Sequence, residues 1–124
     1  MTIAAVLTAA VLTIAQPPAA RCPAGEGEAL GGPWGLSVCE KPAQVSVVMY
    51  DTPQAGARTV AVADDGLLRA AGLLPGDVIY QVAGVRVRTG REVLAAIGEP
   101  SKASGLTVSF WRDGKPYLVW IWAA

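Results

Sequence analysis

The alternation of apolar and polar positions is clearest near the end of the chain. Across 106–111 apolar side chains alternate with polar ones, and this period of two predicts a strand. Asp113 and Gly114 then supply the turn of a hairpin, and the apolar run 117–122 predicts the return strand. Earlier β-branched or apolar runs between Gly and Pro predict further strands at 36–39, 45–50, 59–63, 78–82 and 85–87.

Two short segments have the pattern of helices. The first covers 67–71 and is stopped by Gly72, a residue that suits a left-handed helix end. The second begins at Thr89, whose hydroxyl can cap the first turn, and runs through Ile97. Leu94 and Ile97 are three residues apart, so they share one face of that helix.

Strands and helices in this mixed order indicate an α+β fold. We expect a partly open β-barrel of about six strands, capped by the two helices. The segments 45–50 and 59–63 are expected to pair as a hairpin across the turn at Pro53. The Pro- and Gly-rich segment 16–32 is expected to be a linker or lead-in, which leaves one domain at 33–122.

Composition narrows the classes of function. The 124 residues include ten acidic and ten basic side chains, so no basic excess favours nucleic-acid binding. No histidine is present, which excludes the Ser-His and Cys-His pairs of many hydrolases and the commonest zinc ligand. The two cysteines cannot complete a structural zinc site by themselves. We therefore expect no enzyme activity, no metal and no cofactor.

The first fifteen residues are almost entirely apolar, and this run is too short to span a bilayer as a helix. Its length is that of the apolar region of a signal peptide, with small residues at Thr13 and Ala15 before a cut. The positively charged start of such peptides is missing. The segment 1–15 is thus expected to be a signal peptide, and the alternative is an apolar helix packed on the domain. Export places the domain in the periplasm or outside the cell, with no stable membrane span.

Cys22 and Cys39 support export, because an even number of cysteines in a small exported domain is typical of disulfides. A bridge between them would stabilise the fold by about 3 kcal/mol in the chain-entropy model. The alternative is a pair of buried free thiols in a cytosolic protein.

The centre of the chain carries a specific motif. Ala-Gly-Leu at 71–73 is followed by Leu74, by Pro-Gly-Asp at 75–77, and by an apolar strand that ends in a small-Gly turn. This order resembles bacterial PDZ domains, in particular those of periplasmic proteases, and the resemblance extends over about 32–122. It implies that the expected barrel is PDZ-like. The motif residues themselves build turns and core, so they indicate the fold rather than a ligand.

In PDZ domains a peptide C-terminus binds between the second strand and the second helix, where it adds as an extra strand. Its carboxylate rests on a loop with the pattern apolar-Gly-apolar, which Trp34, Gly35 and Leu36 resemble. The resemblance implies that the backbone N–H groups of this loop form an anion-binding nest. The alternative is a Gly-Pro turn with a half-buried tryptophan before a strand.

The resemblance also implies the walls of the groove. Leu36 and Val38 are expected on one side and Leu94 and Ile97 on the other, so the last ligand residue is expected to be apolar. Gly90 occupies the position where many animal PDZ domains carry a histidine that selects Ser or Thr in the ligand. Without that side chain we expect weak selectivity there. Ile97 serves equally well as core.

Two interpretations remain open. The extra segment 40–57 allows 45–50 to be the groove strand in place of 36–39, which affects Val38 most. Trp120 and Trp122 fall on one face of the last strand, where they mark either an interface or, as we prefer, a strand buried on both faces.

The expected function is a non-catalytic module that binds protein or peptide C-termini with an apolar last residue, or extended segments. One alternative is a regulatory domain acting in trans on a serine protease. Another is a structural or oligomerisation domain whose groove is filled by the chain itself.

Overall fold

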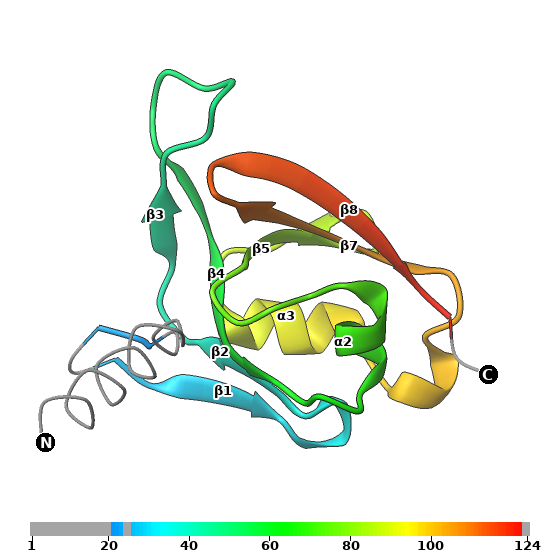
Figure 1. Cartoon of the computed structure of the whole chain (residues 1–124). Coiled ribbons are helices and arrows are strands. Elements are labelled where there is room, and N and C mark those ends of the chain that lie inside the picture. The colour runs from blue at the N-terminus through cyan, green and yellow to red at the C-terminus, as the bar shows by residue number, and fades with distance from the viewer. Residues whose placement is uncertain (1–20, 24–25, 123–124) are drawn as a thin grey trace, which may run out of the picture.

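The computed structural model describes residues 21–23 and 26–122 (Figure 1). The predicted signal peptide at 1–15 lies outside the described residues. Of the predicted linker at 16–32, residues 16–20 and 24–25 also lie outside them. Among the residues that are described, no helix is long and apolar enough to cross a membrane.

Eight strands and two α-helices within the described residues confirm the α+β class. The strands are β1 (Glu28–Gly31), β2 (Leu36–Cys39), β3 (Ala43–Val45), β4 (Gln54–Val62), β5 (Val78–Val82), β6 (Val85–Arg86), β7 (Leu106–Arg112) and β8 (Lys115–Ile121). The helices are α2 (Leu67–Ala71) and α3 (Gly90–Ile97), and two 3₁₀ turns are η1 (Gly32–Trp34) and η2 (Pro100–Lys102).

The strands form one mostly antiparallel sheet in the order β1-β2-β4-β5-β7-β8, with β3 paired to β4 and β6 paired to β5. The sheet is not closed into a barrel, and β1 and β8 are the ends of its order. In Figure 1 the β1–β2 pair and the β7–β8 hairpin lie on opposite sides of the molecule, with α3 and α2 between them.

Local signals explain the helix and hairpin that were expected near the C-terminus. The Thr89 hydroxyl accepts the N–H of Glu92, while the Glu92 carboxylate accepts the Thr89 N–H, a complete capping box. Asp113 and Gly114 both have positive φ, as the tight turn between β7 and β8 requires.

Two predictions about strands are wrong. The segment 46–50 is not a strand, because β3 ends at Val45 and the chain then turns at Val47, whose carbonyl accepts the Tyr50 N–H at 3.0 Å. Only Val47 of this segment is buried, against Trp111. The sheet also contains β1, which lies in the segment expected to be a linker. The sheet formed by residues 28–121 therefore has eight strands rather than about six.

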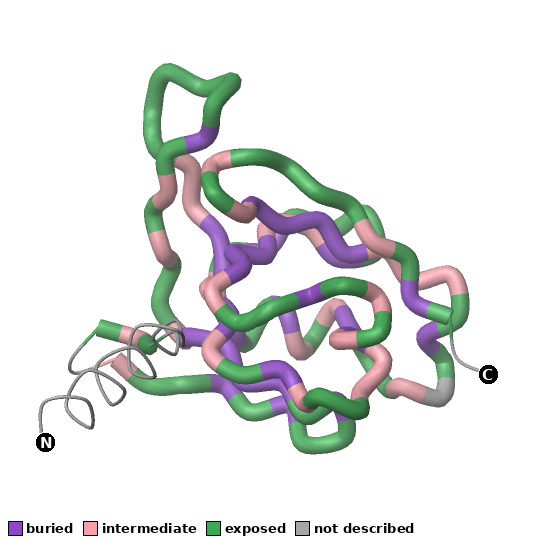
Figure 2. The backbone as a smooth tube through the Cα atoms, viewed as in Figure 1, coloured by how far each residue is buried: buried purple, intermediate pink, exposed green. Residues whose placement is uncertain are grey.

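The main core lies between the inner face of the sheet and the two helices (Figure 2). Phe110, Leu68 and Leu73 are among its largest fully buried side chains. A smaller cluster of Val47, Val78 and Trp111 lies apart from this core. The sheet therefore has a well-packed inner side and only a small apolar cluster elsewhere.

Asp77 holds the Pro-Gly-Asp turn. Its carboxylate accepts the Leu74 N–H at 2.7 Å and two N–H groups of Arg112, also at 2.7 Å, and only 2% of it is exposed. The hydrogen bond to Asp77 raises the pKa of Arg112 above its usual value. The motif thus joins the turn to β7 and serves the fold, as its sequence indicates.

Candidate functional site: the edge of β2 beneath α3

The seven residues expected to bind a peptide come from three adjoining elements. Trp34 ends η1 and Gly35 follows it, Leu36 and Val38 lie on β2, and Gly90, Leu94 and Ile97 lie on α3. The site residues are buried except for the half-buried Leu94 and the exposed Gly35. The sequence reasoning therefore selected elements that do lie against one another, with β2 at 36–39 as the strand beside α3.

The edge of β2 at this site is already paired. β1 lies antiparallel along it, with Glu28 opposite Cys39, Ala29 opposite Val38, Leu30 opposite Ser37 and Gly31 opposite Leu36. β1 runs directly into η1 and then into β2, so the three elements form one hairpin (Figure 1). An extended segment of the chain thus occupies the place where the sequence led us to expect a peptide.

Small side chains let β1 fit closely under α3. Ala29 and Gly31 are buried, whereas the alternate residues Glu28 and Leu30 are exposed. A Cβ built on Gly31 would lie 2.7 Å from the Leu94 side chain. A Cβ built on Gly90 would lie 2.9 Å from that of Ala29 and 2.8 Å from the carbonyl oxygen of Val38. Helix and strands therefore meet without room for one more methyl group.

Gly90 has a structural reason to be glycine that sequence reasoning did not find. We expected its missing side chain to weaken ligand selectivity. In the structure its absence allows the first turn of α3 to contact the backbone of β2. The spacing of Ala29 and Gly31 just before the Gly-Pro-Trp-Gly loop was the available signal, and it was overlooked because neither residue favours strands.

The backbone of the loop is engaged within the protein. Gly35 has φ +61°, a left-handed conformation that favours glycine, and its N–H donates to the Gly32 carbonyl at 3.1 Å. Its own carbonyl accepts the Ala63 N–H at 2.9 Å, and a side chain at Gly35 would collide with Ala63. At least one N–H of the expected nest is therefore already used.

Trp34 ties the loop to the far end of α3. Its indole Nε1 donates to the Gly98 carbonyl at 2.8 Å, and the ring is 4% exposed. The ring packs in the main core together with Leu36 and Ile97. Both ends of α3 are thus fixed to the β1–β2 hairpin, by Gly90 at the start and by Trp34 after the end.

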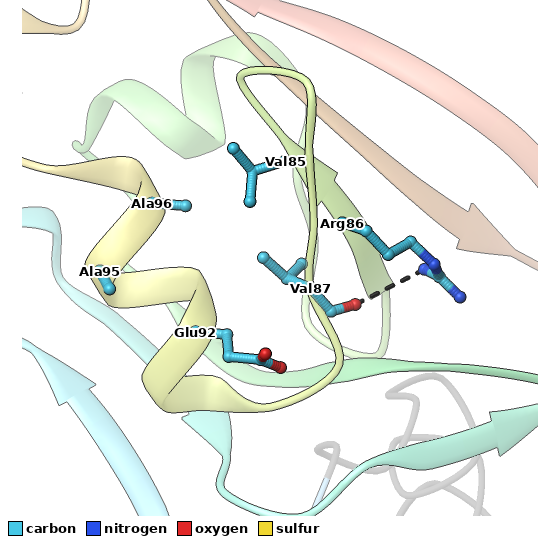
Figure 3. Close-up of a pocket in the computed structure, with 6 residues that line it drawn as sticks. All are labelled: Val85, Arg86, Val87, Glu92, Ala95 and Ala96. Atoms are coloured by element: carbon cyan, nitrogen blue, oxygen red, sulfur yellow. Dashed lines mark hydrogen bonds between the residues drawn. The ribbon is translucent and has the colours of Figure 1, made fainter.

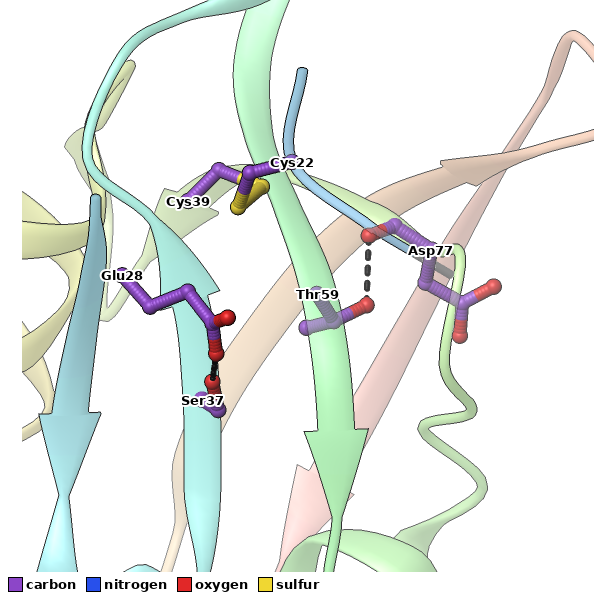
Figure 4. The surroundings of a disulfide bond; sticks show 6 residues. All are labelled: Cys22, Glu28, Ser37, Cys39, Thr59 and Asp77. Atoms are coloured by element: carbon purple, nitrogen blue, oxygen red, sulfur yellow. Dashed lines mark hydrogen bonds between the residues drawn. A yellow bond between two sulfur atoms is a disulfide. The ribbon is translucent and has the colours of Figure 1, made fainter. Parts of the chain in front are cut away.

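The predicted disulfide is confirmed between Cys22 and Cys39 (Figure 4). It joins the segment before β1 to the last residue of β2 and excludes the alternative of free thiols. The Glu40 N–H donates to the Gly27 carbonyl at 2.9 Å, and the Ser37 hydroxyl donates to the Glu28 carboxylate. β1 is therefore held on β2 by backbone pairing, side chains and a covalent bond.

A shallow hollow of about 330 Å³ lies on the opposite side of α3 from β1 (Figure 3). Val85, Val87, Ala95 and Ala96 form its apolar surface. Arg86, one of the two charged residues beside it, is hydrogen-bonded within the protein. It donates to the Tyr80 and Ala55 carbonyls at 2.9 and 2.8 Å.

Glu92, the other charged residue of the hollow, belongs to the capping box. Hydrogen bonds from the Arg88 N–H and then the Thr89 N–H lower its pKa below the ordinary 4.5. The hollow therefore presents apolar surface. A ligand could bind to the charges of Arg86 or Glu92 only by breaking hydrogen bonds that these side chains make within the protein.

In the part of the chain that the structure describes, no group of three or more acidic or cysteine side chains is arranged to hold a metal ion. No protein-family model matches the chain, and no curated protein matches it.

Proposed function

We propose that this chain is a non-catalytic, PDZ-like module of the periplasm or the extracellular space that binds an extended polypeptide segment along β2 and beneath α3. A ligand strand would take the place that β1 occupies. The protein partner would supply a C-terminus or a flexible segment with small or apolar side chains at alternate positions.

One observation carries the proposal: this site already holds an extended segment. β1 makes a four-residue antiparallel pairing with β2, and its alternate residues Ala29 and Gly31 turn toward α3. Main-chain pairing supplies affinity and alternate side chains supply selectivity when a strand is added to a sheet. The same elements therefore offer the contacts that a peptide ligand needs.

The order of elements supports the PDZ-like interpretation. From β2 onward the chain runs through β3, the long strand β4, the short helix α2, the Pro-Gly-Asp turn, β5, β6, α3 and the final hairpin. Apart from β3, which lies in the extra segment 40–57, this is the order that the resemblance implies. The disulfide supports an oxidising compartment, where such bonds persist.

Because β1 fills the site, binding is expected to require its displacement. The chain continues from Gly31 into Gly32, so a ligand carboxylate can reach the loop only after this hairpin has opened. A site that is open only part of the time has an apparent affinity reduced by the open fraction. We expect weak binding by the native chain and tighter binding when β1 is loosened.

The test compares two neighbouring substitutions on β1. Ala29→Gln places a polar side chain at a position that is 7% exposed beneath α3, whereas the control Leu30→Gln changes a side chain that is 73% exposed. Probes are a random C-terminal peptide library and a synthetic peptide matching 26–31, each as free acid and as amide. Fluorescence anisotropy should show at least about tenfold tighter peptide binding for Ala29→Gln than for Leu30→Gln.

Comparing the free-acid and amide forms of each peptide distinguishes recognition of a C-terminus from recognition of an internal segment. Loss of binding on amidation means carboxylate capture by the loop after Pro33, and binding that survives means recognition of an internal segment. If Ala29→Gln and the reduced chain both stay folded by circular dichroism and bind no peptide, the proposal fails. β1 is then a permanent structural strand.

A further inference from the structure

The last strand of the sheet is open on its outer edge. In the described residues β8 pairs with β7 alone, and no strand follows it in the sheet order. Its pairing runs without a shift from Leu106 opposite Ile121 to Arg112 opposite Lys115. The edge is therefore free of bulges, and beyond Pro116 it has backbone donors and acceptors that no described strand uses.

Large apolar side chains follow this edge on the outer face of the sheet. Leu118, Trp120 and Trp122 share that face, and they are 55%, 53% and 67% exposed. The two indole rings stack at 6.2 Å between centroids. Their exposure overturns the expectation of a strand buried on both faces. Only the inner face is covered, where Ile121 belongs to the main core.

Exposed edges usually carry charges, bulges or prolines that prevent pairing with another chain. β8 has such features only at its start, where Lys115 and Pro116 follow the turn. From 117 to 122 there is no acidic or basic side chain. The second half of the strand thus lacks the usual protection against strand addition.

We propose that β8 is a dimerisation strand that pairs antiparallel with β8 of a second copy of this chain. A register centred on Val119 sets Leu118 of each copy opposite Trp120 of the other, which joins two apolar rows into one. The contact is isologous, so no complementary surface elsewhere is needed. The formal net charge of zero also means that two copies do not repel each other.

A second copy suits this edge better than a lipid surface. Membrane-surface sites combine apolar side chains with clustered Lys and Arg, and 117–122 has the apolar side chains but no Lys or Arg. The exposed side chains and one strand edge amount to an interface on the order of 1,000 Å² over both copies, below standard size. The dimer is accordingly weak, with a dissociation constant in roughly the micromolar range.

The test is sedimentation velocity of the oxidised full chain over a concentration series. Leu118→Lys should raise the dimer dissociation constant at least about tenfold, because it places two like charges in the joint sheet. Val85→Lys is the matched control, since Val85 is also 55% exposed but lies on β6. This control should dimerise like the native chain.

Hydrogen exchange distinguishes strand pairing from general stickiness. Backbone amides of 117–121 should become more protected as concentration rises, and this change should disappear in Leu118→Lys. A native chain that stays monomeric up to millimolar concentration overturns the proposal. So does a dimer that Leu118→Lys and Trp120→Lys both leave intact, or one without added protection on β8. The proposal concerns the opposite end of the sheet order from the peptide site, so either can fail alone.

Discussion

β1 and β8, the two ends of the sheet order, differ in how far their edges are covered. β1 is four residues long, turns small side chains inward, lies under α3 and is fixed by the Cys22–Cys39 bond. β8 is seven residues long, carries the exposed Trp120 with the exposed Trp122 just after it, and has helix contact on its inner face only. One edge is closed by the chain itself, and the other is left open to a partner. The proposed peptide binding at the first would therefore require rearrangement, whereas the proposed dimerisation at the second would require only sufficient protein concentration.

Of the features that distinguish the two edges, the disulfide should make the largest contribution to the free energy of unfolding. Reduction, or the double change Cys22→Ser and Cys39→Ser, should lower the free energy of unfolding by about 3 kcal/mol, because the bond limits the unfolded chain. Urea denaturation measures this loss. The serine variant places a hydroxyl at the buried position 39, which could add a cost of its own. Reduction of the native chain removes the bond without adding this hydroxyl, so it serves as the control and should give the same loss.

Hydrogen exchange on the reduced chain then sharpens the comparison. Amides of β1 and β2 should exchange faster, while those in the β7–β8 pairing should change much less. An equal acceleration at both ends would mean that the bond stabilises the whole fold and does not hold one edge in particular.

Gly90→Ala should have the next largest effect. In an ordinary helix this change stabilises, because alanine favours helices over glycine by up to about 1 kcal/mol. Here the methyl group would meet the Val38 and Cys39 carbonyl oxygens at 2.8 Å, so we expect a loss of about 2 kcal/mol. The matched control is Gly32→Ala, where a Cβ meets nothing within 4 Å. Stabilisation by Gly90→Ala in thermal unfolding would show that α3 does not press on this edge.

The smallest effect concerns the cap of α3. Thr89→Ala removes the hydroxyl that accepts the Glu92 N–H at 3.2 Å and should cost about 1 kcal/mol. Glu92 adds a dependence on pH. Because its folded pKa is lowered, its contribution is fully present above about pH 4.5 and is lost as pH falls through the lowered pKa.

Denaturation at pH 7 and pH 3 measures this dependence. Glu92→Gln should differ from the native chain at pH 7, and the difference should shrink at pH 3. A difference that is unchanged at pH 3 would mean that the carboxylate charge does not support the cap.

Local chemistry explains which elements could be predicted. Thr89 predicts the start of α3, Asp113 and Gly114 predict the last hairpin, and the cysteine pair predicts the disulfide. The first two signals act within a few residues and so do not depend on the rest of the fold, whereas the cysteines are brought together by the β1–β2 hairpin.

Tertiary context explains the failures. β1 has the sequence Glu-Ala-Leu-Gly, which has no strand preference of its own and is extended because β2 and α3 hold it. The run 45–50 has strong strand preference, yet only Val47 finds a buried place. Trp120 and Trp122 are predicted to be buried because their rings are apolar, but the outer face of the sheet is uncovered at the last strand and leaves them exposed. For the same reason the sequence predicted β2 and α3 but did not reveal that β1 lies against both of them.

The shortness of β1 has a consequence for assembly. A sheet with two open edges can add copies head to tail and grow into a filament. Here β1 offers only four residues, its alternate positions are committed to α3, and the Ser37 and Glu28 side chains bond across its pairing with β2. Growth through β8 therefore has no equivalent surface to continue from, and self-association should stop at two copies.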